Sequence, residues 1–189
     1  MKKDIVLCGV GGQGILSIAT IIAEAATLSG VYLKQAEVHG MSQRGGDVES
    51  DLRLSNEEIC SDLIPKGGAD LIVSMEPMEA LRQLAYLKKD GMVIASSSPF
   101  VNIPNYPDQE AMMRELQSLP RVKVRDVEKM SKENNVPRSG NMILLGMAAK
   151  EIEIVGVDAL RESIKRIFEV KGRSVVEANA KAFEVGLSC

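Results

Sequence analysis

Short apolar runs alternate with longer amphipathic segments along the chain. The apolar runs predict strands buried in a parallel sheet, and the segments with apolar residues at helical spacing predict helices. The predicted strands span residues 4–9, 31–36, 48–54, 69–75, 92–96 and 121–124. The predicted helices span residues 12–28, 56–63, 77–88, 108–119, 126–134, 141–151, 157–168 and 173–185.

This alternation predicts one doubly wound α/β domain over residues 1–189, Rossmann-like, with a mostly parallel sheet and helices on both faces. The first strand, the helix after it and the second strand are expected to form a right-handed βαβ unit. Residues 48–54 instead alternate apolar and polar side chains, which is typical of a half-exposed strand. We expect an edge strand there, antiparallel to its neighbour. Residues 89–91 predict a turn, and three prolines predict a loop over residues 97–107.

The composition argues against nucleic-acid and membrane partners. The net charge is -3, so no basic field is available for a phosphate backbone. Aromatic residues make up 3% of the chain and Trp is absent, so stacking platforms for bases are not expected. No apolar run approaches the roughly 20 residues that span a bilayer.

Three single cysteines, Cys8, Cys60 and Cys189, form neither a disulfide framework nor a paired metal clamp. The first residues lack the pattern of a secretory signal. We therefore expect a cytoplasmic protein with reduced thiols, no metal site and no iron–sulfur cluster of its own.

A glycine-rich turn joins the first strand to the first helix. It reads Gly9-Val-Gly11-Gly12-Gln13-Gly14, a G-x-G-x-x-G pattern that brings a phosphate close to the N–H groups of a helix N-terminus. Glu37, at the end of the second strand, suits the ribose hydroxyls of NAD or FAD. The other interpretation is that the glycines only let the helix pack on the sheet, with a phosphate or a partner's backbone at the turn.

A second glycine-rich segment follows the second strand and is predicted to be a loop. It reads Glu37-Val-His-Gly-Met-Ser-Gln-Arg-Gly-Gly-Asp47 and lies where open α/β sheets bind ligands. Arg44, with small polar neighbours, suits a phosphate or carboxylate, or an ion pair across a subunit interface. His39 is either an acid/base or a solvated or interface residue; the latter is favoured because no catalytic partners are evident.

No hydride-transfer site accompanies the turn, because the chain has one His and no Tyr-x-x-x-Lys pair. Near the C-terminus, Lys171-Gly-Arg-Ser174 is either an anion site or, more commonly, a basic turn before a Ser-capped helix.

The glycine turn followed by Ile15-Leu16, and then the segment Glu37–Gly46, resemble the gamma domain of 2-oxoacid:ferredoxin oxidoreductases. The form that matches best is the separate beta subunit of indolepyruvate ferredoxin oxidoreductases. Later segments agree over essentially the whole chain: residues 64–67, 76–81, 139–146 and 175–179.

The resemblance implies a complex that oxidatively decarboxylates a 2-oxoacid on thiamine diphosphate, reduces ferredoxin through [4Fe-4S] clusters and transfers the acyl group to coenzyme A. This sequence lacks the Gly-Asp-Gly…Asn pattern that holds Mg²⁺ and thiamine diphosphate, and it lacks cluster cysteines. The resemblance therefore places those cofactors in a larger catalytic alpha subunit. It makes this chain a non-catalytic subunit of a complex that acts on indolepyruvate or other aryl pyruvates.

The resemblance also suggests which residues face the partner. The cofactor-binding candidates are Gly9, Gly11, Gly12, Gln13, Gly14, Ser42, Arg44 and Gly45. The interface or active-site loop candidates are Glu37, His39, Gly40, Met41, Gln43 and Gly46. Whether coenzyme A is shared with this chain stays open, although its phosphates suit backbone N–H groups and Arg44.

Two other functions remain at this point: a self-sufficient NAD-binding oxidoreductase and a nucleotide-sensing module. Without its partner, the chain is expected either to leave part of the loop disordered or to form a homo-oligomer.

Overall fold

Six strands form one mixed sheet in the computed structural model, which describes residues 1–40 and 45–189, with only the backbone of His39. The strand order is β2-β3-β1-β4-β5-β6. Strands β1 (Lys2–Val10), β4 (Ala69–Ser74), β5 (Leu87–Ser96) and β6 (Val122–Arg125) are parallel. Strand β3 (Asp47–Ser55) is antiparallel to both β1 and β2 (Tyr32–His39). The predicted mostly parallel α/β sheet is confirmed.

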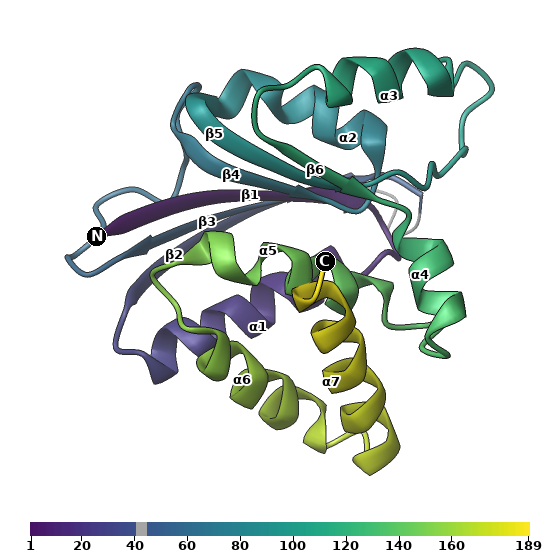
Figure 1. The fold of residues 1–189 in the computed structure, drawn as a ribbon. Helices are drawn as coiled ribbons and strands as arrows, with labels where there is room; N and C mark the ends of the chain where they lie inside the picture. The colour runs from purple at the N-terminus through teal and green to yellow at the C-terminus, as the bar shows by residue number, and fades with distance from the viewer. Residues whose placement is uncertain (41–44) are drawn as a thin grey trace.

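Helices cover both faces of the sheet (Figure 1). One face carries α1 (Ile15–Leu28), α5 (Gly140–Ile152), α6 (Val157–Glu169) and α7 (Arg173–Leu187). The other carries α2 (Pro77–Arg82), the 3-10 helix η1 (Gln83–Tyr86) and α3 (Gln109–Gln117), whereas α4 (Val127–Glu133) lies beside the end of β6. None of the described helices has both the length and the apolar character needed to cross a membrane.

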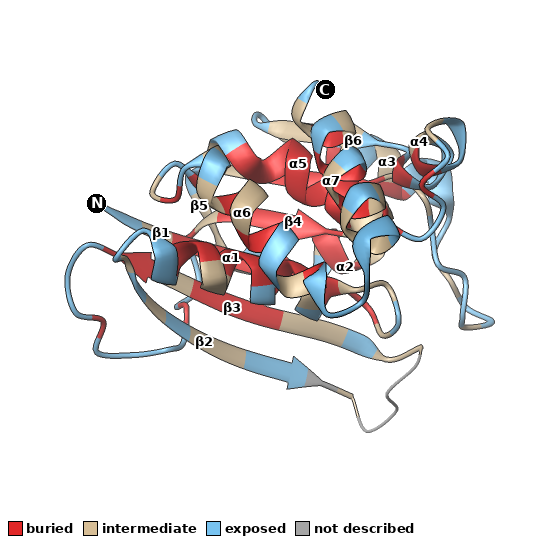
Figure 2. Ribbon diagram, turned by 90° about the horizontal axis from the view of Figure 1, so that it is seen from below, coloured by how far each residue is buried: buried red, intermediate tan, exposed pale blue. Residues whose placement is uncertain are grey.

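Strand β1 shows why both faces need cover. Ile5 and Leu7 point into the larger core with α1 and α5, whereas Val6 and Cys8 point into the smaller core with Leu116 of α3. All four strand side chains are almost inaccessible to solvent. Figure 2 shows the resulting buried layer between the sheet and the helices. The continuous apolar run in the sequence therefore reflects a central strand.

The antiparallel strand is not at the edge, contrary to the prediction for residues 48–54. Strand β3 lies between β1 and β2, so β2 is the edge strand and the predicted βαβ unit does not join neighbouring strands. On β3, Leu52 and Leu54 are fully buried in the larger core. Arg53, on the opposite face, bonds to Asp4 of β1 with its Nε 3.0 Å from Oδ1. The polar side chains of β3 therefore have partners inside the protein. Their alternation with buried leucines produced the pattern that we interpreted as an edge strand.

Four local features also differ from the prediction. Residues 56–63 form no helix, and Arg53 Nη1 instead donates to the carbonyl oxygens of Ser61 and Leu63. The helix predicted over residues 77–88 ends with η1, and residues 89–91 lie within β5 near a register shift instead of forming a turn. Strand β2 extends to His39, so Glu37 and His39 lie in a strand and not in a loop.

Helices α5 and α7 touch through their backbones. A Cβ atom on Gly146 would lie 2.1 Å from the carbonyl oxygen of Phe183, and one on Gly186 would lie 1.9 Å from that of Ile143. No side chain fits at either position, so two glycines set the distance between these helices. This contact fixes α7 against α5, which is buried along most of its length.

We expect Gly146→Ala to lower the free energy of unfolding by about 1–3 kcal/mol or more, because the added methyl group overlaps backbone atoms that cannot move separately. The matched control is Gly156→Ala, since a Cβ there meets nothing within 4 Å. The control should cost less than about 1 kcal/mol. Denaturant unfolding of the two variants measures the difference, and equal stabilities would contradict the backbone contact.

A buried carboxyl on β3 makes the stability depend on pH. Asp51 is 7% exposed; its Oδ2 accepts a hydrogen bond from Ile64 N, and its Oδ1 has no partner among the described residues. Burial raises the pKa of Asp51 to about 6, the Ile64 N–H lowers it, and the nearby Glu49 and Asp4 raise it. The folded protein therefore holds this proton more tightly than the unfolded chain does.

Because the pKa of Asp51 is raised on folding, its contribution to stability is lost as the pH rises from about 4 through about 6. We expect Asp51→Asn to be more stable than the wild type at pH 7.5 and to lose part of this pH dependence. Thermal unfolding at pH 5 and pH 7.5 measures both effects. Asp62→Asn, at an exposed aspartate, controls for the loss of one negative charge. A wild-type pH profile in Asp51→Asn would show that this carboxyl is not responsible.

Candidate functional site

The candidate site lies where the carboxyl ends of β1 and β4 meet. After β1 the chain enters α1 on one face of the sheet, and after β4 it enters α2 on the other face. Open α/β sheets form a ligand crevice where successive connections leave in opposite directions. The glycine turn that follows β1 occupies this crevice.

Gln13 holds the turn in shape. Its Oε1 accepts a hydrogen bond from Val10 N at 2.7 Å, and its Nε2 donates to the carbonyl oxygen of Met75 at 3.4 Å, just beyond β4. A Cβ on Gly9 would lie 2.9 Å from that Oε1, so Gly9 leaves room for the Gln13 side chain. Both ends of the Gln13 amide have partners in the protein. The side chain therefore orders the turn, and one N–H of its amide is left over beside the cavity that Gln13 lines.

The two glycine-rich segments meet, as their positions in the sequence suggested. Gly11 N donates to the carbonyl oxygen of Gly46 at 2.8 Å, and Gly45 N donates to that of Gly11 at 3.3 Å. Gly40 N donates to Asp47 O and closes the β2–β3 hairpin. Met41, Ser42, Gln43 and Arg44 lie outside the described residues. The backbone of the hairpin end thus forms one wall beside the turn.

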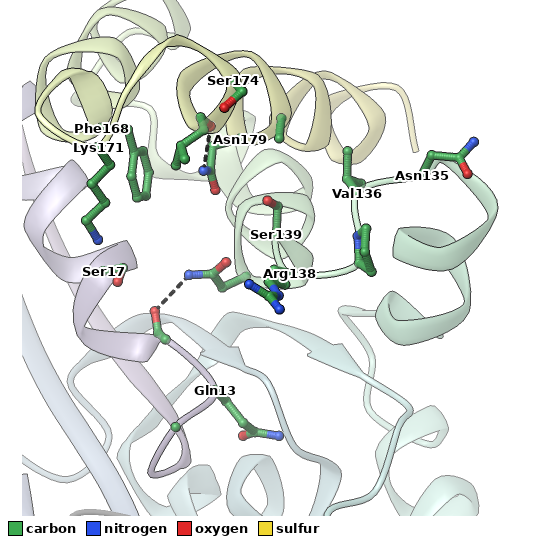
Figure 3. A pocket seen from close by; sticks show the side chains of 16 residues that line it. Gln13, Ser17, Asn135, Val136, Arg138, Ser139, Phe168, Lys171, Ser174 and Asn179 are labelled. Carbon is green, nitrogen blue, oxygen red and sulfur yellow. Dashed lines mark hydrogen bonds between the residues drawn. The ribbon is translucent and has the colours of Figure 1, made fainter.

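Three helices begin at one cavity of about 620 Å³ beside the turn (Figure 3). The first residues of α1, α5 and α7 contribute to its lining, and their N-cap residues Gly14, Ser139 and Gly172 make no side-chain capping bond. By contrast, α2, α3 and α4 are each capped by a carboxylate. Uncapped N–H groups and the positive ends of three helix dipoles therefore gather at this cavity, which favours an anion.

The side chains at the cavity add positive charge. Of the described residues that line it, Arg138 and Lys171 are cationic and none is acidic. Figure 3 shows Arg138 in the segment before α5 and Lys171 in the turn before α7, with the Lys171 ammonium 5.3 Å from the centre of the Phe168 ring. Ser17 and Ser174 supply hydroxyl groups. Such a set of donors suits phosphate groups.

A second cavity of about 280 Å³ adjoins the first across the glycine turn. The two share Gly12, Gln13, Arg138 and Asn141 among their lining residues, and the second extends to Ser96, at the end of β5, and to Phe100 in the loop after it. We call these two adjoining cavities the groove.

Asn141 fastens α5 to the turn. Its Nδ2 donates to the carbonyl oxygen of Gly14 at 3.1 Å, the interaction drawn as a dashed line in Figure 3. Gly14 has φ +82°, and a Cβ there would lie 2.5 Å from that Nδ2. Gly14 is therefore required both for its backbone conformation and for the approach of Asn141. This contact brings the N-termini of α1 and α5 together.

Sequence reasoning missed Arg138 and Asn141 as site residues. Both lie more than 120 residues after the glycine turn, and only the resemblance over residues 139–146 pointed to this segment. Lys171 was noted in a segment interpreted as an anion site or, more commonly, a basic turn before a Ser-capped helix. Ser174 does not cap α7, whose N-cap residue is Gly172, and both Lys171 and Ser174 line the cavity. Loop segments that converge only after folding carry no local sequence signal.

The structure does not place Glu37 beside the turn. Glu37 is exposed on β2, where Gln35 Nε2 donates to it, and β3 separates β2 from β1. Two strand spacings amount to about 10 Å. In a dinucleotide-binding domain the acidic residue follows the strand next to the first one. This arrangement therefore does not support a ribose contact at Glu37.

Comparisons with known proteins agree with this geometry. The model of the pyruvate ferredoxin/flavodoxin oxidoreductase family matches residues 4–189. The chain belongs to this family. It is 33% identical to the indolepyruvate oxidoreductase subunit IorB of Archaeoglobus fulgidus, over 98% of this chain and 94% of that one. The prediction of an oxidoreductase subunit is confirmed, and the NAD-binding alternative is not favoured.

Solved structures of the family share the fold. Pyruvate oxidoreductase subunit PORC of Thermotoga maritima superposes with a TM-score of 0.74 at 21% identity, covering 99% of this chain and 96% of that one. The 2-oxoglutarate:ferredoxin oxidoreductase of Magnetococcus marinus, with 2-oxoglutarate, coenzyme A and succinyl-CoA bound, gives a TM-score of 0.78 at 22% identity. The match covers 99% of this chain and 30% of that longer chain.

We expect Gly14→Ala to destabilise the protein more than Gly12→Ala. Both glycines have positive φ, so each substitution costs about 1–2 kcal/mol in backbone strain, but a Cβ on Gly12 meets nothing within 4 Å. Only Gly14→Ala displaces Asn141. In an Asn141→Ala background the extra cost should disappear, which a double-mutant cycle of unfolding free energies measures. An additive cycle would contradict the fastening role of Asn141.

Proposed function

We propose that this chain is the non-catalytic subunit of an indolepyruvate or aryl-pyruvate:ferredoxin oxidoreductase and that the cavity at the glycine turn seats the phosphates of coenzyme A. The observation that carries the coenzyme A assignment is the convergence of three uncapped helix N-termini and two cations on a cavity without acidic lining residues. Coenzyme A carries a diphosphate and a separate 3′-phosphate, so its charge matches this arrangement. The Magnetococcus marinus enzyme, which shares the fold, has coenzyme A bound.

The redox chemistry is assigned to a larger catalytic subunit. Among the described residues, no group of three or more His, Cys, Asp or Glu side chains is arranged to hold a metal ion. The sequence also lacks the thiamine diphosphate motif and cluster cysteines. We assign thiamine diphosphate, Mg²⁺ and the [4Fe-4S] clusters to that subunit, ferredoxin to the complex as electron acceptor, and the whole assembly to the cytoplasm.

The substrate proposal rests on the relative named for indolepyruvate. Thiamine diphosphate in the partner would supply the decarboxylation chemistry, two ferredoxins would each take one electron, and the acyl group would pass to the thiol of coenzyme A with release of a proton. This chain's share is to hold the distant, anionic end of coenzyme A so that the thiol reaches the reacting carbon. Side chains that select the 2-oxoacid then belong to the partner.

We expect Arg138→Gln and Lys171→Gln each to raise the KM for coenzyme A about tenfold in the assembled complex, because each removes a charge-assisted hydrogen bond to phosphate. The KM for the 2-oxoacid and the kcat at saturating coenzyme A should stay close to wild type. Steady-state kinetics with ferredoxin reduction as the readout measures all three values. The effect should shrink at high salt.

The matched control is Arg173→Gln. Arg173 lies two residues after Lys171 in the sequence, does not line the cavity and pairs with Glu177. The control should leave the KM for coenzyme A unchanged. A wild-type KM for coenzyme A in both cavity variants would show that this cavity does not bind coenzyme A. The loop residues proposed from the sequence, Ser42 and Arg44, are tested by Arg44→Ala in the same assay, and unchanged coenzyme A affinity and turnover would exclude them.

A further inference from the structure

The segment between β5 and α3 forms an ordered loop at the same end of the sheet as the glycine turn. Residues 97–108 read Ser-Ser-Pro-Phe-Val-Asn-Ile-Pro-Asn-Tyr-Pro-Asp, with three prolines, no basic residue and one acidic residue. Prolines restrict the backbone and lower the entropy that the loop would lose on binding. The loop is therefore apolar, nearly uncharged and stiff.

A buried carboxylate holds this loop in place. Glu76, just after β4, is fully buried, and its Oε2 caps α2 by accepting from Glu79 N at 2.9 Å. Its Oε1 accepts from Phe100 N at 3.3 Å and from the hydroxyl of Tyr106. Burial and the bond to Glu76 raise the pKa of Tyr106. Because a buried carboxylate is costly unless its oxygens are bonded, this carboxylate depends on the loop for two of its partners.

Further hydrogen bonds connect the loop to both sides of the site. Ser98 Oγ donates to Asp126, the N-cap of α4, at 2.8 Å. Asn102 Nδ2 donates to the carbonyl oxygen of Gly45, in the hairpin wall beside the glycine turn. The loop is thus fixed relative to the groove and does not depend on a ligand for its position.

Two neighbouring apolar side chains project from this fixed loop. Phe100 is 42% exposed and Val101 is 61% exposed. Phe100 also lines the second cavity, which Lys171 does not line, and the neighbouring Val101 lines a separate depression with Ile103 and Tyr106 of the same loop. Rigid, exposed apolar residues beside a ligand groove are typical of an interface anchor.

We propose that Phe100 and Val101 anchor this chain to the catalytic subunit, beside that subunit's reaction centre. The inference rests on the proposed function: when the phosphates lie at Arg138 and Lys171, the thiol arm follows the groove past the turn toward Phe100. The chain carries no cofactor motif for the acyl transfer, so the partner's reaction centre must meet the groove at that end.

The test is the affinity of the full chain for its catalytic subunit, measured by titrating this chain onto the immobilised subunit. The variant is Phe100→Ser combined with Val101→Ser, and its thermal unfolding curve checks that the half-buried Phe100 is not needed for folding. The matched control is Leu63→Ser, which is 63% exposed and lies at the opposite end of the sheet, where Arg53 holds its carbonyl. We expect at least a tenfold rise in Kd for the double variant and less than a twofold change for the control.

Glu76→Gln gives a second variant with the anchor residues intact. The substitution weakens the hydrogen bonds that connect Glu76 to Phe100 and Tyr106 of the loop. It should therefore raise the Kd for the catalytic subunit, and the thermal unfolding curve should still show a folded chain.

A wild-type Kd for the double variant would overturn the inference and leave the proposed function standing. A variant that changes only self-association, with no change in Kd for the catalytic subunit, would assign the surface to a second copy and would also overturn it. If the wild-type chain itself fails to bind the catalytic subunit, the proposed function fails, and this inference fails with it.

Discussion

Backbone contacts that only glycine allows determine how the site is built. Gly146 and Gly186 let α7 touch α5, and Gly14 lets Asn141 of α5 reach the carbonyl at the start of α1. A methyl group at Gly146 or Gly186 would displace the C-terminal end of α7 from α5, and one at Gly14 would displace Asn141 from the start of α1. These contacts therefore fix how the helices that line the cavity are placed.

The convergence has an electrostatic consequence. The N-termini of α2, α3 and α4 carry carboxylate caps. Those of α1, α5, α6 and α7 have no side-chain cap, and the first residues of α1, α5 and α7 line the cavity. On the face of the sheet opposite α1 and α5, burial raises the pKa of both Asp51 and Glu79 to about 6.

Much of the fold could be predicted from the sequence, because apolar runs such as residues 4–9 and 69–75 belong to strands buried on both faces. The place of β3 could not be predicted, since its alternating pattern arises from Arg53 and Asp51 finding partners inside the protein. The helix expected over residues 56–63 does not form, because side chains such as Arg53 donate hydrogen bonds to the carbonyl groups of this segment.

The glycine turn and its meeting with the hairpin could be located from local motifs, because both follow strands at one end of the sheet. Arg138, Asn141 and Lys171 could not, since they join the turn only through the packing of α5 and α7. The roles of Ser42, Arg44 and the His39 side chain stay predictions from the sequence.

The most direct test of the account is a competition titration on the assembled wild-type complex with coenzyme A, dephospho-coenzyme A and NAD. An anion site built for three phosphates predicts that coenzyme A binds more tightly than dephospho-coenzyme A and that NAD does not displace it. Equal affinity for the first two, or displacement of coenzyme A by NAD at similar concentration, would contradict the account.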